Sequence, residues 1–412
     1  MSIQIEIIPI EPFNDGVAAG KNSGRQQLQK RTDELLKSEY LKDSLGAMSR
    51  AALEYYVLSR LETQPDYGRF PELEDIYPER LDFLRGFAEG ADCSLIEAAV
   101  ADYVSYREFI TSWHQGLQLQ REPQHCGGVF MNGPEGILGG QSVESGAEPK
   151  PAGYKHRTPK PYSGLKSIAH NLDKLVLRKP RTGYIERWGV TNEKGVGCCA
   201  SNSCSVWLDE PIEDTWPIKE FPLLRFARDV NHLEELYRRY TLHCWGRFSQ
   251  VWADTSGDAV VIEKSFRRIG TRRSQDGVLW CTEGHWESAE MSSYMRAKRL
   301  EYIERAGKHL GAGDMQYATD CAVRFTNLGA LCHEPWGRGY EHVRRILTNH
   351  APFPRAVCRH NGPDTAPYDE SVTQTSWFYD LTHNRSYTRN WIPWKKFPCE
   401  MPEKVVQYPA RP

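Results

Sequence analysis

Cys126 is a candidate nucleophile because it stands at the start of a predicted strand, directly after a polar stretch. It follows a polar, turn-like approach ending in His125 and precedes a glycine pair, an apolar run and a glycine break. A second apolar run then ends in Gly139-Gly140-Gln141, so the stretch predicts two paired strands with the cysteine at the head of the first. Such a cysteine can act as a nucleophile where a base is near. A buried structural cysteine is the competing interpretation, because thiols are among the most buried side chains.

The other clusters of potential ligands do not have the spacing of a metal or nucleotide site. Cys198 and Cys199 with Cys204, and Cys332-His333 with Cys358, lack the Cys-x₂-Cys spacing of structural zinc. No Gly-x-Gly-x-x-Gly or phosphate-binding loop signature occurs either. The sequence therefore predicts no metal and no cofactor.

The first part of the chain reads as mostly helical. Residues 3–10 alternate like a strand, and the Gly- and Asn-rich residues 14–24 predict a loop. Residues 25–118 carry apolar residues at helical spacings. Within them, Ser94 and Glu97 have the spacing of a capping box at a helix start.

The rest of the chain mixes hairpins with helices. Residues 145–181 are rich in Pro, Gly, Lys and Arg and predict an irregular excursion. Hairpins are expected at 187–202 and 248–263, a strand ending near Trp280, helices at 221–239 and 291–307, and strands at 356–360 and 376–387. This order predicts an α+β architecture with sheets in the middle.

Composition limits the classes of function. Of the 412 residues, 40% are hydrophobic and 26% charged, and the net charge of −2 gives no electrostatic footprint for nucleic acid. No apolar run has the length of a membrane helix, and the N-terminus has no basic region of a secretory signal. Eleven cysteines without a regular framework favour a reducing compartment, so a cytoplasmic protein is expected.

A series of short blocks from about residue 68 to the C-terminus resembles, in order, a known family. The blocks are Cys126 at a strand head, Gly140-Gln141-Ser142-Val143-Glu144, Gly189 to Val196 with Asn202, Asp254 to Asp258 followed by Glu263, Ser292 to Leu300, Val357-Cys358-Arg359-His360, and Phe397-Pro398-Cys399. Together they resemble the acyl-coenzyme A:6-aminopenicillanic acid acyltransferase-like family of the N-terminal nucleophile (Ntn) hydrolases, which is related to penicillin V acylase and the bile-salt hydrolases. The chain differs from the family pattern in Gly127-Gly128 after the cysteine, in His125 before it, and in Ser142 and Glu144.

The resemblance implies a four-layer α/β/β/α sandwich of two antiparallel sheets between helical layers. It also implies that the precursor cuts itself between His125 and Cys126, into residues 1–125 and 126–412, which stay together. The freed α-amino group, with an ordinary pKa of about 7.7–8.0, would accept the proton of the thiol. The thiolate would then form an acyl-enzyme on a small-molecule amide or thioester, for transfer to water or an amine.

The same resemblance implies roles for further side chains. Asn202 would stabilise the oxyanion, and Glu144 would bind the α-amino group or an arginine unless it is a solvated carboxylate at a strand end. Arg296 would pair with Glu144 or an anionic substrate, or else be a surface charge. Gln141 and His285 would line the substrate site. The expected partners are a small-molecule substrate and the second processed chain, with a homo-oligomer possible and neither nucleic acid nor membrane. A non-catalytic, unprocessed binding protein of the same fold is the alternative.

Overall fold

The computed structural model of the chain describes residues 3–4, 12–61, 78–119, 126–146, 190–192, 194–203, 218–219, 227–239, 244–245, 248–265, 267–282, 287–309, 312–351, 356–359, 371–390 and 398–407. The excursion expected at 145–181 lies outside these residues beyond residue 146. In the described part, no helix combines the length and the apolar character that a membrane crossing requires.

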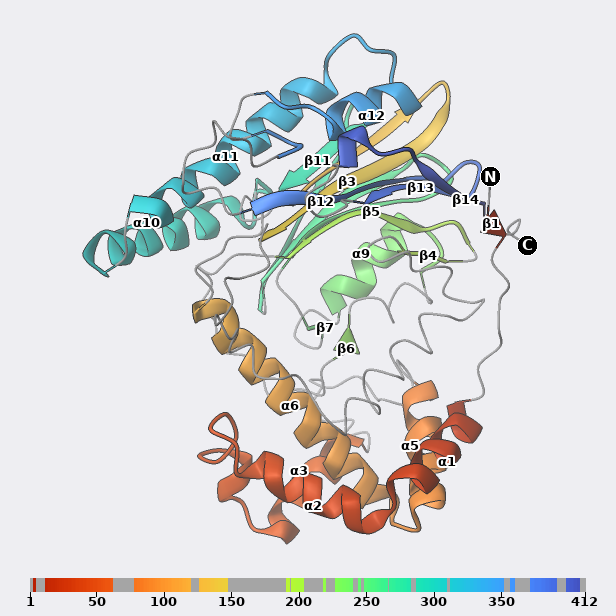
Figure 1. Cartoon of the computed structure of the whole chain (residues 1–412), viewed down its shortest axis with the longest axis vertical. Coiled ribbons are helices and arrows are strands. Elements are labelled where there is room, and N and C mark those ends of the chain that lie inside the picture. Colours follow the sequence, from red (N-terminus) through yellow and green to blue (C-terminus); the bar gives the residue numbers. More distant parts are fainter. Residues whose placement is uncertain are drawn as a thin grey trace.

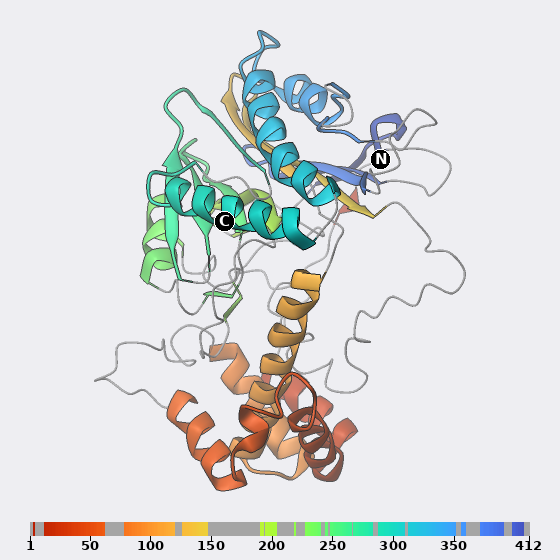
Figure 2. The same cartoon turned by 90° about the vertical axis from the view of Figure 1, so that its left-hand side faces the viewer.

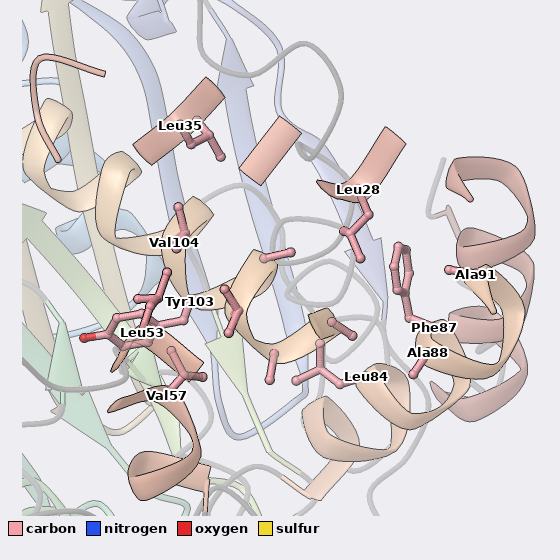
Figure 3. Close-up of a cluster of buried hydrophobic side chains, with 14 of the residues drawn as sticks. Leu28, Leu35, Leu53, Val57, Leu84, Phe87, Ala88, Ala91, Tyr103 and Val104 are labelled. Atoms are coloured by element: carbon pink, nitrogen blue, oxygen red, sulfur yellow. The ribbon is translucent and has the colours of Figure 1, made fainter. Parts of the chain in front are cut away.

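The helices that precede Cys126 form a group with a hydrophobic core of its own (Figures 1 and 2). They are α1 (Pro12–Ser23), α2 (Arg25–Leu36), α3 (Arg50–Leu61), α5 (Pro78–Ala91) and α6 (Leu95–Leu119). Figure 3 shows how leucine, valine, phenylalanine and tyrosine side chains of α2, α3, α5 and α6 meet in this core. The helical character expected for residues 25–118 is confirmed within the described residues. Helix α6 leads from this group toward the sheets (Figures 1 and 2).

The prediction of a loop at residues 14–24 is wrong, because these residues form most of helix α1. A Cβ atom on Gly20 would lie 2.3 Å from the backbone oxygen of Phe87, and one on Gly90 would lie 2.1 Å from that of Val17. Gly16 of α1 and Gly86 of α5 make the same kind of reciprocal contact. Glycines four residues apart share one face of a helix, so here they mark two backbones in direct contact rather than a break in structure.

The capping box at the start of α6 is present as predicted. The backbone N–H of Ser94 donates to Glu97 Oε2 at 2.9 Å, and the backbone N–H of Glu97 donates to Ser94 Oγ at 3.2 Å. Glu97 also accepts hydrogen bonds from Arg25 and Gln29 of α2. Burial alone would raise the pKa of Glu97, but these hydrogen bonds outweigh it and lower the pKa to about 2.

A seven-stranded sheet contains the strand that follows Cys126. Its strand order is β1-β14-β13-β12-β3-β2-β11, antiparallel throughout except for β1 against β14. The bounds are β1 (Ile3–Gln4), β2 (Gly127–Gly133), β3 (Gly136–Gly146), β11 (Val278–Thr282), β12 (Ser371–Asp380), β13 (Arg385–Asn390) and β14 (Lys404–Gln407). Strand β2 therefore lies between β3 and β11, and the expected hairpin of Cys126 is confirmed.

A second, antiparallel sheet has the strand order β10-β9-β8-β5-β4. Its strands are β4 (Val190–Thr191), β5 (Gly197–Ser203), β8 (Phe248–Ala253), β9 (Ala259–Lys264) and β10 (Ile269–Arg273). Both hairpins expected here, β4–β5 and β8–β9, are present. Asn192 serves the first turn, because its Oδ1 accepts from the backbone N–H groups of Lys194 and Val196. A short parallel pair, β6 (Ile218–Lys219) and β7 (Cys244–Trp245), lies apart from both sheets.

The two sheets pack face to face with helices outside each of them. One buried core, which includes Phe130, Val143, Val251 and Val261, lies between the sheets. A second core joins the seven-stranded sheet to α11 (Ala312–Cys332) and α12 (Tyr340–Leu347), and a third joins the five-stranded sheet to α9 (Val230–Arg239). Helix α10 (Ser292–His309) lies beside α11 (Figure 1). The predicted α/β/β/α sandwich is confirmed by this layering.

Two expected elements differ from the structure. Of a third, the strand expected at 3–10, Ile3–Gln4 is a strand and residues 5–10 lie outside the described residues. Residues 356–359 form bends instead of a strand. Their backbone hydrogen bonds are isolated ones, from Cys358 N–H to the oxygen of Asn349 and from Thr373 N–H of β12 to the oxygen of Arg359. The expected helix at 221–239 begins at Val230, where Asp254 Oδ2 accepts from the first backbone N–H at 3.0 Å.

Candidate active site at the head of strand β2

Cys126 lies immediately before β2 and is 5% exposed. Its side chain belongs to the core between the two sheets, together with Val143 of β3 and Ala200 of β5. Because successive residues of a strand face opposite sides of a sheet, Cys126 and Gly128 share the inter-sheet face, while Gly127 faces helix α11. The chain thus places the thiol in the interior of the sandwich, at the head of β2, which lies next to the edge strand β11.

The two glycines after Cys126 have different structural roles. A Cβ atom on Gly128 would lie 2.0 Å from Ala200 Cβ of the opposite sheet, so a side chain has no room there. A Cβ atom on Gly127 would lie 3.0 Å from Leu328 Cδ1 and 3.6 Å from Arg324 Nη2, both on α11. The close approach of β5 at Gly128 gives a physical reason for this departure from the family pattern.

Beneath Gly127, on the side of the sheet that faces α11, a buried ion pair joins Glu144 of β3 to Arg324. Arg324 donates to the carboxylate from both guanidinium ends, at 3.1 Å to Oε1 and 3.4 Å to Oε2. The side chains of Glu144 and Arg324 are 0% and 1% exposed. Arg324 Nη2 also donates to the backbone oxygen of Val357 at 3.3 Å. Glu144 is therefore a buried, paired group, and its interpretation as a solvated strand end is wrong.

A bulge in β12 brings a third group to this pair. The pairing of β12 with β3 shifts between Thr373 and Thr375, so that Thr373 lies opposite Glu144 while Thr375 lies opposite Val143. One extra residue reverses the side that a strand residue faces. The hydroxyl of Thr373 donates to Glu144 Oε1 at 3.1 Å and accepts the backbone N–H of Arg359 at 2.8 Å.

The charge of Glu144 depends on its partners. Burial raises the pKa of its carboxyl, and the positive charges of Arg324 and Arg359 oppose that rise. Hydrogen bonds from Ser142 and Thr373 oppose the rise as well, but burial prevails and the pKa stays raised. Arg324 and Thr373 hold the Glu144 side chain in one position, because a displacement would leave buried polar groups without their partners.

The other residues singled out from the sequence are distributed as follows. Gln141 is fully buried in β3, in register with Gly128 on one side and Trp377 on the other. Arg296 is exposed on α10, and the arginine beside Glu144 is Arg324. Asn202 lies in β5 in register with Ser249, with its side chain outside the described part. His125 and His285 lie outside the described residues.

Arg324 is the residue of this site that sequence reasoning missed. Among residues 321–332 of α11, whose burial is described, the buried positions are Cys321, Arg324, Leu328, Gly329, Leu331 and Cys332. Their spacing is that of one apolar stripe on a helix, with a single arginine inside it. A charge within an apolar stripe is the signal that points to a buried partner, since arginine is almost never fully buried unless it is paired.

A cluster of metal-ligating side chains occurs apart from Cys126. Within the described residues, His350, Cys358 and Cys399 have ligand atoms that all lie within 4.8 Å of one another. None of these residues shares the inter-sheet core with Cys126. The cluster is therefore distinct from the core that holds the thiol of Cys126.

Comparison with known proteins gives similarity at the level of solved structures. No family model matches the chain, and no curated protein matches it. A mutant of the conjugated bile acid hydrolase from Clostridium perfringens is 12% identical, with 70% of this chain and 92% of that chain covered and a TM-score of 0.31. Penicillin V acylase from Agrobacterium tumefaciens is 12% identical, with 68% and 80% covered and a TM-score of 0.30. Scores this low carry no argument, so the fold assignment rests on the strand order and the layering described above.

Proposed function

We propose that this chain is a cysteine Ntn enzyme that cleaves or forms an amide bond of a small molecule through an acyl-enzyme. One observation carries the proposal: Cys126 heads an internal strand on the inter-sheet side, while a buried carboxylate–arginine pair lies under the next residue on the other side. A purely structural cysteine needs no such pair. Removing two charges from water costs free energy, and ionisable groups with perturbed pKa values cluster at functional sites.

In the proposed mechanism the peptide bond between His125 and Cys126 is cut first. The new α-amino group of Cys126 accepts the thiol proton, and the thiolate adds to the carbonyl carbon of the amide. The tetrahedral intermediate then breaks its C–N bond to give the acyl-enzyme, and the departing amine takes the proton held by the α-amino group. Arg324 and Thr373 hold Glu144 in place through hydrogen bonds. Glu144 in turn would position the end of the strand and interact with the α-amino group of Cys126. Asn202 would donate to the oxyanion of the tetrahedral intermediate. Water or an amine then takes the acyl group, and both outcomes use the same intermediate.

The first test is self-cleavage on a denaturing gel. The processed protein gives fragments of 125 and 287 residues, the two parts of the 412-residue chain. Cys126→Ala is expected to remain one intact chain. Cys199→Ala is the matched control, because Cys199 is equally buried in the same core and is expected to be processed normally. If the wild type stays uncut yet still turns over amides, the Ntn mechanism is refuted.

The second test is trapping of the acyl-enzyme. Mass spectrometry of the mature protein with an amide or thioester donor should show the acyl mass on the fragment that begins at Cys126. Asn202→Ala should slow acylation by roughly 10²–10³-fold, the usual effect of removing one oxyanion donor. A wild type that is uncut and acquires no adduct would refute the enzyme proposal and favour a binding protein of the same fold.

A further inference from the structure

Two thiols and one imidazole meet at a point that the proposed catalytic chemistry does not use. His350 follows α12, Cys358 lies in the segment 356–359, and Cys399 lies in the short helix Pro398–Glu400 near the C-terminus. Their ligand atoms all lie within 4.8 Å of one another. Cys358 is buried, Cys399 half-buried and His350 exposed, so the cluster reaches from the interior to the surface.

The backbone around the cluster is held in place before any ligand binds. The backbone N–H of Cys358 donates to the oxygen of Asn349 at 2.9 Å, which ties Cys358 to the residue before His350. Asn327 of α11 donates to the oxygen of Ala351 at 2.8 Å on the other side of His350. The thiol of Cys358 is hydrogen-bonded to that of Cys399. Two neighbouring segments and a third from near the C-terminus thus converge, and their ligand atoms all lie within 4.8 Å of one another.

We propose that His350, Cys358 and Cys399 bind one zinc ion. Thiolate and imidazole are the ligands of tetrahedral zinc, with Zn–S of about 2.3 Å and Zn–N of about 2.0–2.1 Å. Tetrahedral ligands at those distances lie roughly 3.5–4 Å apart, so small side-chain rotations close the site. Oxygen-preferring ions such as calcium and magnesium do not fit this donor set. Two thiolates and a neutral imidazole balance the double charge of the ion, and the fourth position is left for water or another donor.

The site would act on the candidate active site through the segment that carries Cys358. The residue before it, Val357, accepts a hydrogen bond from Arg324, and the residue after it, Arg359, bonds Thr373. Arg324 and Thr373 are the two hydrogen-bonding partners of Glu144 described above. Zinc at Cys358 would therefore anchor the C-terminal segment to the residues that hold Glu144. The proposal stands whether or not Cys126 is catalytic.

The test is metal analysis of the full-length protein, purified under reducing conditions without a chelator. About one zinc per chain is expected in the wild type and in Cys332→Ser, a buried cysteine outside the cluster that serves as the control. Cys399→Ser and His350→Gln should each lower zinc affinity by at least about tenfold. His350 is exposed, so its variant is expected to fold. Replacement of zinc by cobalt should give thiolate-to-metal charge-transfer absorption, which Cys399→Ser removes.

Three results would overturn the proposal. One is a reduced wild type that retains no zinc and takes up no cobalt. Another is unchanged zinc in both Cys399→Ser and His350→Gln. The third is a disulfide between Cys358 and Cys399 in the reduced preparation, detected by peptide mass spectrometry, because the same two sulfur atoms cannot then bind the ion. As an independent readout, removal of zinc by a chelator should increase hydrogen exchange in residues 356–359, whereas the control segment β8–β9 should not change.

Discussion

Replacing Arg324 by methionine tests whether the charge of Glu144 depends on a single partner. Methionine keeps an unbranched apolar stem in place of the aliphatic part of the arginine but removes the guanidinium. The measurement is best made in the Cys126→Ala chain, so that every variant is one intact polypeptide. Arg296→Met is the matched control, because Arg296 is exposed on α10 and a surface substitution of this kind changes stability by less than about 0.5 kcal/mol.

The expected loss follows from the burial of the pair. Glu144 and Arg324 are 0% and 1% exposed, and removing one partner of such a pair usually costs about 3–5 kcal/mol. The hydroxyl of Thr373 and the charge of Arg359 remain, so a loss near the lower end, about 3 kcal/mol, is expected. The double variant Arg324→Met/Glu144→Leu removes both charges and should recover about 2 kcal/mol or more of that loss.

The loss should also depend on pH. Burial already raises the pKa of Glu144 in the folded protein, and removal of Arg324 raises it further. A carboxyl with a raised pKa in the folded state favours folding when protonated and loses that advantage as pH rises through the folded pKa. The difference in free energy of unfolding between Arg324→Met and its parent should therefore be larger at neutral pH than in the acidic range. All other groups titrate alike in the two chains and cancel.

Urea unfolding followed by tryptophan fluorescence measures these differences directly, with the slope checked for constancy. The prediction is refuted if Arg324→Met lowers the free energy of unfolding by less than about 1 kcal/mol, because removing one partner of a buried ion pair should lower it by more. It is also refuted if the loss of unfolding free energy in the double variant equals the sum of the losses in Arg324→Met and Glu144→Leu, because the two residues would then be uncoupled.

Three further predictions concern the packing and the helical group. Gly128→Ala should destabilise by about 1–3 kcal/mol through its 2.0 Å approach to Ala200, and Ala200→Gly in the same chain should restore the urea midpoint; no recovery would contradict the close contact. Gly20→Ala, whose Cβ would lie 2.3 Å from a carbonyl oxygen of α5, should lower the melting temperature, whereas the neighbouring exposed Lys21→Ala should not. Glu97, with its pKa lowered to about 2, contributes stability that is present above the usual pKa of 4.5 and is lost as pH falls toward 2. Glu97→Gln should remove that acid dependence, as measured by urea midpoints between neutral and acidic pH.

The hairpins and the capping box could be predicted because their signals are local, whereas the four-layer sandwich followed from the family resemblance. The turn between β4 and β5 is formed by the Asn192 side chain and its near neighbours, and the capping box of α6 lies within four residues. Helix α1 could not be recognised, since its glycines report on contact with α5, a helix more than fifty residues away. Local preference for a loop was overridden by tertiary packing.

The candidate site was predicted in part for a similar reason. Cys126 and Glu144 belong to one hairpin, so their strands could be placed from the sequence. The arginine that pairs with Glu144 lies 180 residues further along the chain, on helix α11. The sequence patterns predict no element in that region. The role predicted for Arg296 rests on the resemblance of one short block to a family. Such a block does not indicate which helix packs against the sheet.

The extra residue between Thr373 and Thr375 determines which side of the sheet Thr373 faces. If the same strand paired with β3 without the bulge, Gln374 would lie opposite Glu144, and Thr373 would lie one position further along, facing the inter-sheet core. The carboxylate would then lose the hydroxyl that binds it, although no residue of the chain had changed. Deletion of Gln374, by contrast, would leave Thr373 opposite Glu144 in a regular strand. The pairing register of β12 is therefore as much a part of the site as the residue types that it carries.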